Sequence, residues 1–397
     1  MPQKKKSKKP AAKKSAKSGR STKPAKPEKS ETLEALPIYS EVTPAQWKRL
    51  VALASEYRDL KPWEWIYDAD FFGVKSPAHD DICYGSIMGS AGLLYGLAAY
   101  IGPTGLNGFL DTADGVIHPL DFLYMQKCLI SRLEAKDQLM ELDTDIFVLA
   151  GVSIKGNKKW PTFRSYEPGL MEWYLTHSWQ AELLADVFEA ALYIAPIAKV
   201  APERLAPEDE NLVLLLTLEK TPDGYAWKES FFTPERPEEP ELTPLACNQI
   251  RLQKIKNETT VKPGAWEGDL FHLPSPMVDR EDQRPYYPRM AIWADAENGM
   301  ALHFGVDEDS AGLAFFQETF LQSMEKSKQR PELIYLCRFE TEAAIKNVTE
   351  LLGIKVELVE ELPVIFQIRE EMEDAGMDMD EDDFDELEEL EVPGKTE

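Results

Sequence analysis

The chain has 397 residues, of which 43% are hydrophobic, so it is long enough to form two or three domains with substantial cores. Its formal net charge of −26 is uneven, because residues 1–30 carry +11, residues 370–397 carry −14 and residues 31–369 keep −23. An acidic core repels phosphate backbones unless it carries a local basic groove.

The four cysteines lie far apart, with no C-x-x-C pair and no histidine at a metal-ligand spacing. We therefore expect reduced, buried thiols in a cytoplasmic protein, and no cofactor. The first thirty residues lack the apolar segment of a secretory signal. Residues 82–110 are uncharged and long enough to cross a bilayer, but seven glycines interrupt them, so we expect a buried hairpin and no membrane.

The two termini are predicted to be disordered tails, basic over residues 1–40 and acidic over residues 373–397. The basic tail is interpreted as a solubility arm. Alternatively, residues 1–30 bind nucleic acid weakly and without sequence preference, or contact the acidic C-terminus.

The domain over residues 41–200 is predicted to be α+β. Its first helix starts at Thr43, which can cap it, and stops at Lys61-Pro62. After it we expect an extended segment, a hairpin and two further helices: Trp63–Val74, Ile82–Met88 with Leu93–Ile101, Pro119–Met140 and Ser178–Lys199.

Residues 201–284 are predicted to be a β-rich connecting region that contains loops rich in Pro and Glu. The expected strands are Asn211–Leu218, Gly224–Phe232, Gln249–Lys256 and Trp266–Leu273. A linker then leads into the last unit.

The C-terminal unit over residues 285–372 is predicted to be a small α/β domain with one mixed sheet. Its Asn298-Gly299 turn between apolar runs indicates a hairpin. Helices and strands then alternate, in the order hairpin, helix, strand, helix, strand. The predicted elements are Met290–Ala294, Met300–Val306, Ser310–Ser327, Leu333–Cys337, Glu340–Leu352 and Lys355–Glu360, with a short helix from Pro363.

Several motifs resemble a bacterial two-domain family in which domain of unknown function 7309 is followed by domain of unknown function 6930. The first motifs are Trp63-x-Trp65-x-x-Asp68-x-Asp70-x-Phe72-Gly73-Val74, Tyr84, Met88-Gly89, Tyr100-x-Gly102, Gly105-Leu106 and Trp160-Pro161-x-Phe163-Arg164-Ser165-Tyr166-x-Pro168-Gly169. The second half is carried by Leu352-Gly353-Ile354 and Leu362-Pro363 within residues 288–362. The resemblance covers most of residues 45–200 and 285–372. The resemblance implies a two-domain architecture and a protein of the bacterial cytoplasm. It implies no activity.

One candidate anion or partner pocket surrounds Arg164, which aromatic side chains could hold rigid for a carboxylate or phosphate. Its expected walls are Trp160, Phe163, Tyr166 and Trp173. The alternative is that Arg164 fastens a Pro-rich loop to an internal carboxylate.

Two acidic groups are candidate metal sites. Asp68 and Asp70 lie two apart in a segment expected to be extended, so both could bind Mg²⁺ or Mn²⁺ from one face. Asp295, with Glu318 and Glu340, fits the order of acids in a ribonuclease-H-like fold. In the alternative interpretation Asp68 and Asp70 cap and turn the chain beside an aromatic core, and Asp295 is present because Asp favours the hairpin turn that follows it.

The leading functional prediction is a non-catalytic binding or adaptor protein whose protein partner is unknown. The alternative is a metal-dependent phosphoryl-transfer or nucleic-acid-processing enzyme with a ribonuclease-H-like C-terminal unit. Three carboxylates that converge within about 4 Å of one point would favour the enzyme.

Overall fold

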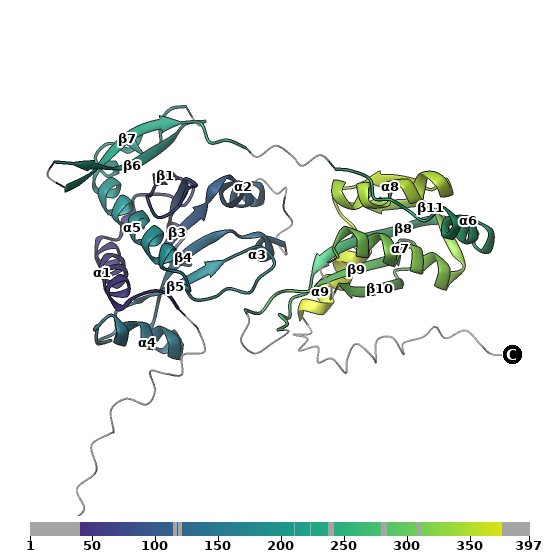
Figure 1. Cartoon of the computed structure of the whole chain (residues 1–397), viewed down its shortest axis with the longest axis horizontal. Coiled ribbons are helices and arrows are strands. Elements are labelled where there is room, and N and C mark those ends of the chain that lie inside the picture. Colours follow the sequence, from purple (N-terminus) through teal and green to yellow (C-terminus); the bar gives the residue numbers. More distant parts are fainter. Residues whose placement is uncertain are drawn as a thin grey trace, which may run out of the picture. The chain divides into compact units, whose positions relative to one another are not determined.

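The computed structural model describes residues 40–113, 117, 121–209, 211–222, 224–236, 242–278, 284–307 and 311–374. Both predicted tails, except Ser40, Glu373 and Asp374, lie outside these residues. The described part is α+β, as expected, and is built around two mixed sheets (Figure 1). No helix in the described ranges is long and apolar enough to cross a membrane.

The first helix, α1 (Pro44–Leu60), has the ends that the sequence predicts. Thr43 accepts a hydrogen bond from the backbone N–H of Gln46, and the Gln46 side chain bonds back to Thr43, which satisfies two otherwise free donors. Lys61 ends the helix in the left-handed conformation, with φ of 56°.

The first sheet has seven strands in the order β5-β4-β3-β2-β1-β6-β7. Strands β1 to β5 form antiparallel neighbours, whereas β6 lies parallel to β1 and pairs Phe72 with Leu214. The β2–β3 hairpin over residues 83–101 confirms the buried hairpin expected there. The strands are β1 (Phe72–Lys75), β2 (Cys83–Met88), β3 (Gly96–Ile101), β4 (Cys128–Glu134), β5 (Trp160–Tyr166), β6 (Val213–Thr221) and β7 (Gly224–Phe232).

Helices cover both faces of this sheet (Figure 1). α1, α4 and α5 supply one core cluster, and α2 packs on the opposite face. α5 contributes buried Leu183, Leu184, Val187 and Phe188, so the helix predicted from these residues is confirmed. The remaining elements are η2 (Pro62–Glu64), α2 (Gly102–Ala113), α3 (Phe122–Met125), η4 (Lys136–Gln138), α4 (Glu141–Leu149), α5 (Ser178–Ala198) and η5 (Pro202–Arg204).

The second sheet has five strands in the order β10-β9-β8-β11-β12. Its alternation of strands and helices follows the prediction from the Asn298-Gly299 turn onward. α6, α7 and α8 pack on one face and α9 on the other. The elements are α6 (Gln249–Glu258), β8 (Thr260–His272), β9 (Arg289–Asp295), β10 (Ala301–Asp307), α7 (Leu313–Ser327), β11 (Gln329–Leu336), α8 (Phe339–Leu352), β12 (Lys355–Leu358) and α9 (Pro363–Asp374).

The central segment 201–284 contributes to both sheets. β6 and β7 extend the first sheet from β1, while β8 is the middle strand of the second sheet. The β-rich character expected for this segment therefore comes from strands that complete neighbouring domains.

Three predicted elements are wrong. Residues 119–140 contain the strand β4 in place of the predicted helix, because the backbone of this strand pairs with β3 on one side and with β5 on the other. Residues 249–256 are helical, since Asn248 caps α6 by accepting from the N–H groups of Ile250 and Arg251. Residues 63–71 form the end of η2 followed by turns and irregular backbone, and the strand starts only at Phe72.

Candidate functional site

The Arg164 guanidinium is engaged inside the protein. Its two terminal nitrogens donate to the two carboxylate oxygens of Asp143 at 2.7 and 2.9 Å, and one of them also donates to the Phe163 carbonyl. The Arg164 carbon Cζ lies 4.2 Å from the ring centre of Tyr174. Arg164 is 5% exposed, so the structure places it as a link from β5 to α4.

The aromatic residues expected around Arg164 lie in separate cores. Trp160 and Phe163 join the cluster that includes α1 and α5, and Phe163 contacts Trp47. Tyr166 belongs to the cluster on the other face and donates to Glu172. These residues do not enclose one pocket, and the aromatic partner of Arg164 is Tyr174, one position past Trp173.

Asp68 and Asp70 bind backbone groups of turns. Asp68 accepts from the N–H and hydroxyl of Ser90 at 3.2 and 2.6 Å, which fastens the β2–β3 turn. Asp70 accepts from the N–H of Tyr67 at 3.0 Å. The two carboxylates therefore serve different turns and do not share a strand face.

Asp295 and Glu318 each form an ion pair with a different basic side chain. Asp295 forms an ion pair with Lys262 and accepts from the N–H groups of Glu297 and Asn298, and these contacts outweigh burial and lower the pKa of Asp295. Glu318 binds Arg251 through both oxygens, at 2.6 and 2.9 Å. Within the described residues, no three His, Cys, Asp or Glu side chains are grouped so that they could hold a metal ion.

All four cysteines are free thiols. Cys83 and Cys128 are buried, as expected, and burial raises the pKa of both. Cys247 is half-buried and Cys337 is exposed, so the expectation of burial is wrong for these two.

An open cavity that the sequence did not predict lies beside Arg49. Its volume is about 610 Å³, and its walls come from α1, α5, the segment after β1 and the β6–β7 hairpin. The lining side chains are Arg49, Pro77, Ala78, Glu182, Asp186, Glu189, Leu218, Tyr225 and Trp227. We call this the Arg49 cavity.

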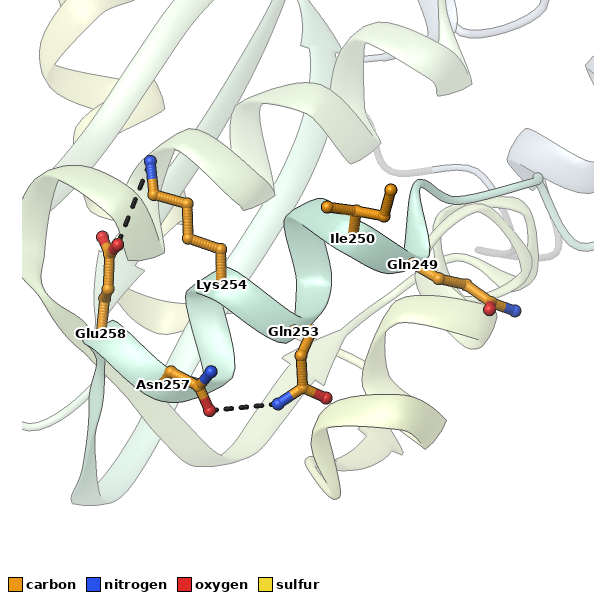
Figure 2. A pocket seen from close by; sticks show the side chains of 6 residues that line it. All are labelled: Gln249, Ile250, Gln253, Lys254, Asn257 and Glu258. Atoms are coloured by element: carbon orange, nitrogen blue, oxygen red, sulfur yellow. Dashed lines mark hydrogen bonds and ion pairs between the residues drawn. The ribbon is translucent and has the colours of Figure 1, made fainter.

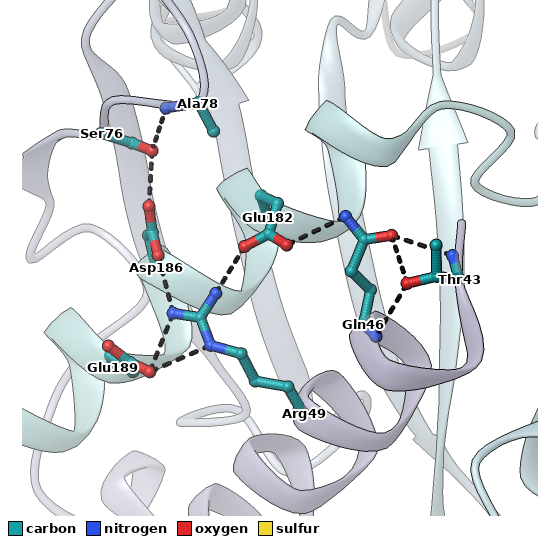
Figure 3. Close-up of polar contacts among 8 residues, drawn as sticks. All are labelled: Thr43, Gln46, Arg49, Ser76, Ala78, Glu182, Asp186 and Glu189. Carbon is teal, nitrogen blue, oxygen red and sulfur yellow. Dashed lines mark hydrogen bonds and ion pairs between the residues drawn. The ribbon is translucent and has the colours of Figure 1, made fainter. Parts of the chain in front are cut away.

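Three carboxylates share one cation in the Arg49 cavity. The guanidinium of Arg49 lies 2.7 Å from Glu182, 2.9 Å from Asp186 and 2.9 Å from Glu189 (Figure 3). The three acids stand at spacings of four and three residues on α5, which brings them to one face of that helix. The group therefore has an excess of two negative charges.

Asp186 is the buried member of these three acids. Burial raises the pKa of Asp186, although the Ser76 hydroxyl and Arg49 both hydrogen-bond to it and lower it (Figure 3). Arg49 thus compensates the buried carboxylate only in part, because it is shared with two other acids. The spacing of the acids on α5 was a usable signal in the sequence, but the arginine and the aromatic wall come from distant segments.

A second, shallower groove follows the exposed face of α6 (Figure 2). Its volume is about 490 Å³, and polar side chains dominate its lining, with Gln253 bonded to Asn257 at 3.0 Å and Lys254 near Glu258. Ile250 is 84% exposed there. All the lining residues of this groove come from one helix, whereas side chains from several elements converge on the Arg49 cavity. The groove is therefore the weaker candidate for a binding site.

Comparison with protein families matches two regions of the chain. Residues 47–215 match the Domain of unknown function (DUF7309), and residues 251–373 match the Domain of unknown function (DUF6930). No curated protein matches the chain. The chain therefore contains a DUF7309 match followed by a DUF6930 match, two domains of unknown function in that order.

Proposed function

We propose that this chain is a non-catalytic protein-binding module that captures an extended segment of a partner along strand β7. The single observation that carries the proposal is the position of β7, a nine-residue strand at the end of the order of the first sheet. An edge strand has a row of backbone groups that can pair with another chain. Addition of a strand from a peptide is a common mode of recognition.

The side chains of β7 support this role. Tyr225 is 68% exposed and Phe231 is 43% exposed, so large apolar groups lie beside the edge. The other sheet edges differ: β5 is buried along its length and Ser165 bridges to Trp173, β10 exposes only Ala301, and β12 has only four residues. Among the described strands, β7 combines an edge, length and exposed aromatic rings.

The Arg49 cavity supports a partner segment that carries Lys or Arg. Tyr225 and Trp227 of β7 line this cavity together with the three acids of α5, so a side chain from a strand paired with β7 could reach it. A cation would reduce the excess negative charge there and could also lie against the aromatic rings. The free cysteines further support a reducing compartment, such as the bacterial cytoplasm.

The test is the binding of a fluorescent peptide, acetyl-Thr-Val-Lys-Val-Lys-Val-Thr-amide, to the full chain by anisotropy. We expect binding that weakens at least about tenfold when alternate peptide nitrogens are methylated, because methylation removes the backbone donors of strand pairing. Tyr225→Ser with Phe231→Ser should also weaken binding. Leu93→Ser, which changes a side chain 90% exposed outside β7, is the matched control.

The charge of the peptide is tested separately. Replacing both lysines of the peptide by Glu should abolish binding, and Glu182→Gln with Glu189→Gln should weaken binding of the Lys peptide about tenfold. Glu203→Gln with Glu208→Gln removes the same charge outside the cavity lining and should have little effect. Equal binding of the methylated and unmethylated peptides would contradict strand addition.

A further inference from the structure

Four charged side chains from distant parts of the chain form a compact group. Asp269 lies on β8, Arg338 follows β11 and Arg369 lies on α9, all within the DUF6930 match. Asp121 precedes α3 and lies within the DUF7309 match. Asp121, Asp269 and Arg369 are buried, and the Arg338 side chain keeps 23% of its surface exposed.

The two arginines hold the carboxylate of Asp121 as they would hold a ligand. Arg338 donates to one oxygen and Arg369 to the other, each at 2.6 Å. Asp269 orients both donors, since it accepts from Nε of Arg338 at 3.0 Å and lies 3.8 Å from Arg369. Arg369 is also positioned over the ring of Phe271, at 4.5 Å. Planar guanidinium groups fixed in this way suit an anion with two or more oxygens.

The charges of these four side chains explain why the two arginines need an anion at the position of the Asp121 carboxylate. Without Asp121 the group contains two arginines and one aspartate, which leaves one uncompensated positive charge in a largely buried place. Such a charge is costly unless an anion pairs with it. Burial alone would raise the pKa of Asp121, but Arg338 and Arg369 outweigh it and lower that pKa, so the carboxylate remains ionised.

We propose that Arg338 and Arg369 form an oxyanion-binding site, for a phosphate or carboxylate group, and that Asp121 occupies it as an internal ligand. An external anion then competes with Asp121, so binding of that anion and docking of the segment at Asp121 exclude each other. The partly exposed Arg338 gives such an anion an approach from solvent. The site is separate from β7 and does not depend on the proposed function.

The test uses the full chain, with inorganic phosphate and acetate as probes, against chloride at equal ionic strength. Asp121→Ala removes the competitor, so phosphate binding followed by phosphorus NMR should tighten at least about tenfold relative to the unsubstituted protein. Arg369→Gln in the Asp121→Ala background should abolish the gain. A rise in melting temperature with phosphate, larger than with acetate, would assign the site to phosphoryl groups; the reverse order would assign it to carboxylates.

The chain offers a matched control in Asp143, which pairs with a single buried arginine, Arg164. Asp143→Ala should gain no comparable phosphate affinity, because its arginine has neither a second cation nor an approach from solvent. If Asp121→Ala does not fold, Asp121→Asn keeps the shape and removes the charge, and it should gain part of the affinity. Unchanged phosphate binding in the folded Asp121 variants, or an equal gain in Asp143→Ala, would overturn the proposal.

Discussion

Arg164 and Arg49 both form ion pairs with carboxylates, yet they differ in what they can do. Arg164 is 5% exposed, and both of its terminal nitrogens donate to one carboxylate, that of Asp143. The Arg49 side chain is 35% exposed and is divided among three acids in an open cavity. The pair of Arg164 and Asp143 fixes β5 to α4. The group around Arg49 keeps an uncompensated negative charge in an open cavity, where a ligand can reach it.

We predict that Arg164→Lys destabilises the protein by about 1–3 kcal/mol despite conserving the charge. Lysine cannot donate to both oxygens of Asp143 in the same plane, so one buried oxygen loses its partner. Urea denaturation measures the change. Arg49→Lys, at the more exposed cluster, should cost less than about 1 kcal/mol, and similar losses for the two variants would contradict the assignment of Arg164 as a buried link.

His272 adds a pH dependence. Burial and the positive charge of Arg289 lower the pKa of His272 to about 4, and its ring stacks on Tyr124 with centres 5.1 Å apart. In the unfolded chain the histidine takes up a proton near its usual pKa of about 6.5. Protonation therefore favours unfolding, and this contribution to stability is lost as the pH falls from about 6.5 towards 4.

We predict that His272→Gln flattens the stability profile in this window. Between pH 6.5 and 4 the unsubstituted protein should lose roughly 1–3 kcal/mol more than the variant does, because glutamine takes up no proton. Urea denaturation at several pH values gives both profiles. His79→Gln is the control, since His79 is only half-buried and also contacts an aromatic ring, that of Trp179, with ring centres 5.0 Å apart. Parallel profiles for the protein and for His272→Gln would disprove this role.

Elements that depend on local signals were predictable. α1 carries its capping residues in the sequence, α5 has one apolar face, and the Asn298-Gly299 turn marks the β9–β10 hairpin. β4 was missed because its conformation is set by pairing to strands on both sides, which overrides the local pattern. α6 was missed because Ile250 and Leu252 alternate as in a strand, although Ile250 is exposed.

The candidate site was less predictable than the elements. Sequence indicated that Arg164 is surrounded by aromatic side chains, but it could not say that Asp143, twenty-one residues earlier, would fill its donors. The Arg49 cavity combines residues from α1, α5 and the β6–β7 hairpin, which only the parallel pairing of β6 with β1 brings together. Such long-range arrangements leave no local trace in one sequence.

Gly268 lies at a position of β8 where a side chain has no space. It pairs with Trp293 on β9, and a Cβ atom at Gly268 would lie 2.4 Å from the Trp293 ring. That ring packs against Phe316 and Phe320 of α7, with ring centres 4.8 and 4.3 Å away. A Cβ atom at Gly268 would therefore force this packed ring to shift.

We predict that Gly268→Ala lowers the free energy of unfolding by about 1–3 kcal/mol through overpacking. Thermal or urea unfolding monitored by tryptophan fluorescence measures the loss. Gly108→Ala is the matched control, because its nearest neighbour would be 3.7 Å away and alanine favours the helix α2. A Gly268→Ala variant as stable as Gly108→Ala would contradict the close packing of Trp293.

At the scale of the whole molecule, charge is segregated along the chain. Residues 1–30 hold eleven Lys and one Arg against one Glu, while the remainder is strongly acidic. The basic segment attracts polyanions by releasing condensed counterions, and the acidic segments oppose that attraction. Any nucleic-acid binding should therefore depend on salt and not on base sequence.

We predict that the full chain binds two unrelated DNA duplexes equally and weakly, and that raising salt from about 50 to 200 mM weakens binding by orders of magnitude. Removal of residues 370–397 should strengthen binding, and removal of residues 1–30 should abolish it. Fluorescence anisotropy of labelled duplexes measures all three proteins. If the protein without residues 1–30 binds as well as the full chain, the basic segment is not the tether.

The parallel pairing of β6 with β1 also has a consequence for biosynthesis. Translation adds about 5–20 residues per second, so roughly 7–28 s separate the synthesis of β1 from that of its partner some 140 residues later. During that interval one side of β1 has no strand to pair with, and the apolar surface that Leu214 and Leu216 later cover is open to solvent. A ribosome paused before residue 213 would thus present a chain prone to self-association, and chaperone binding should be strongest at that stage of synthesis.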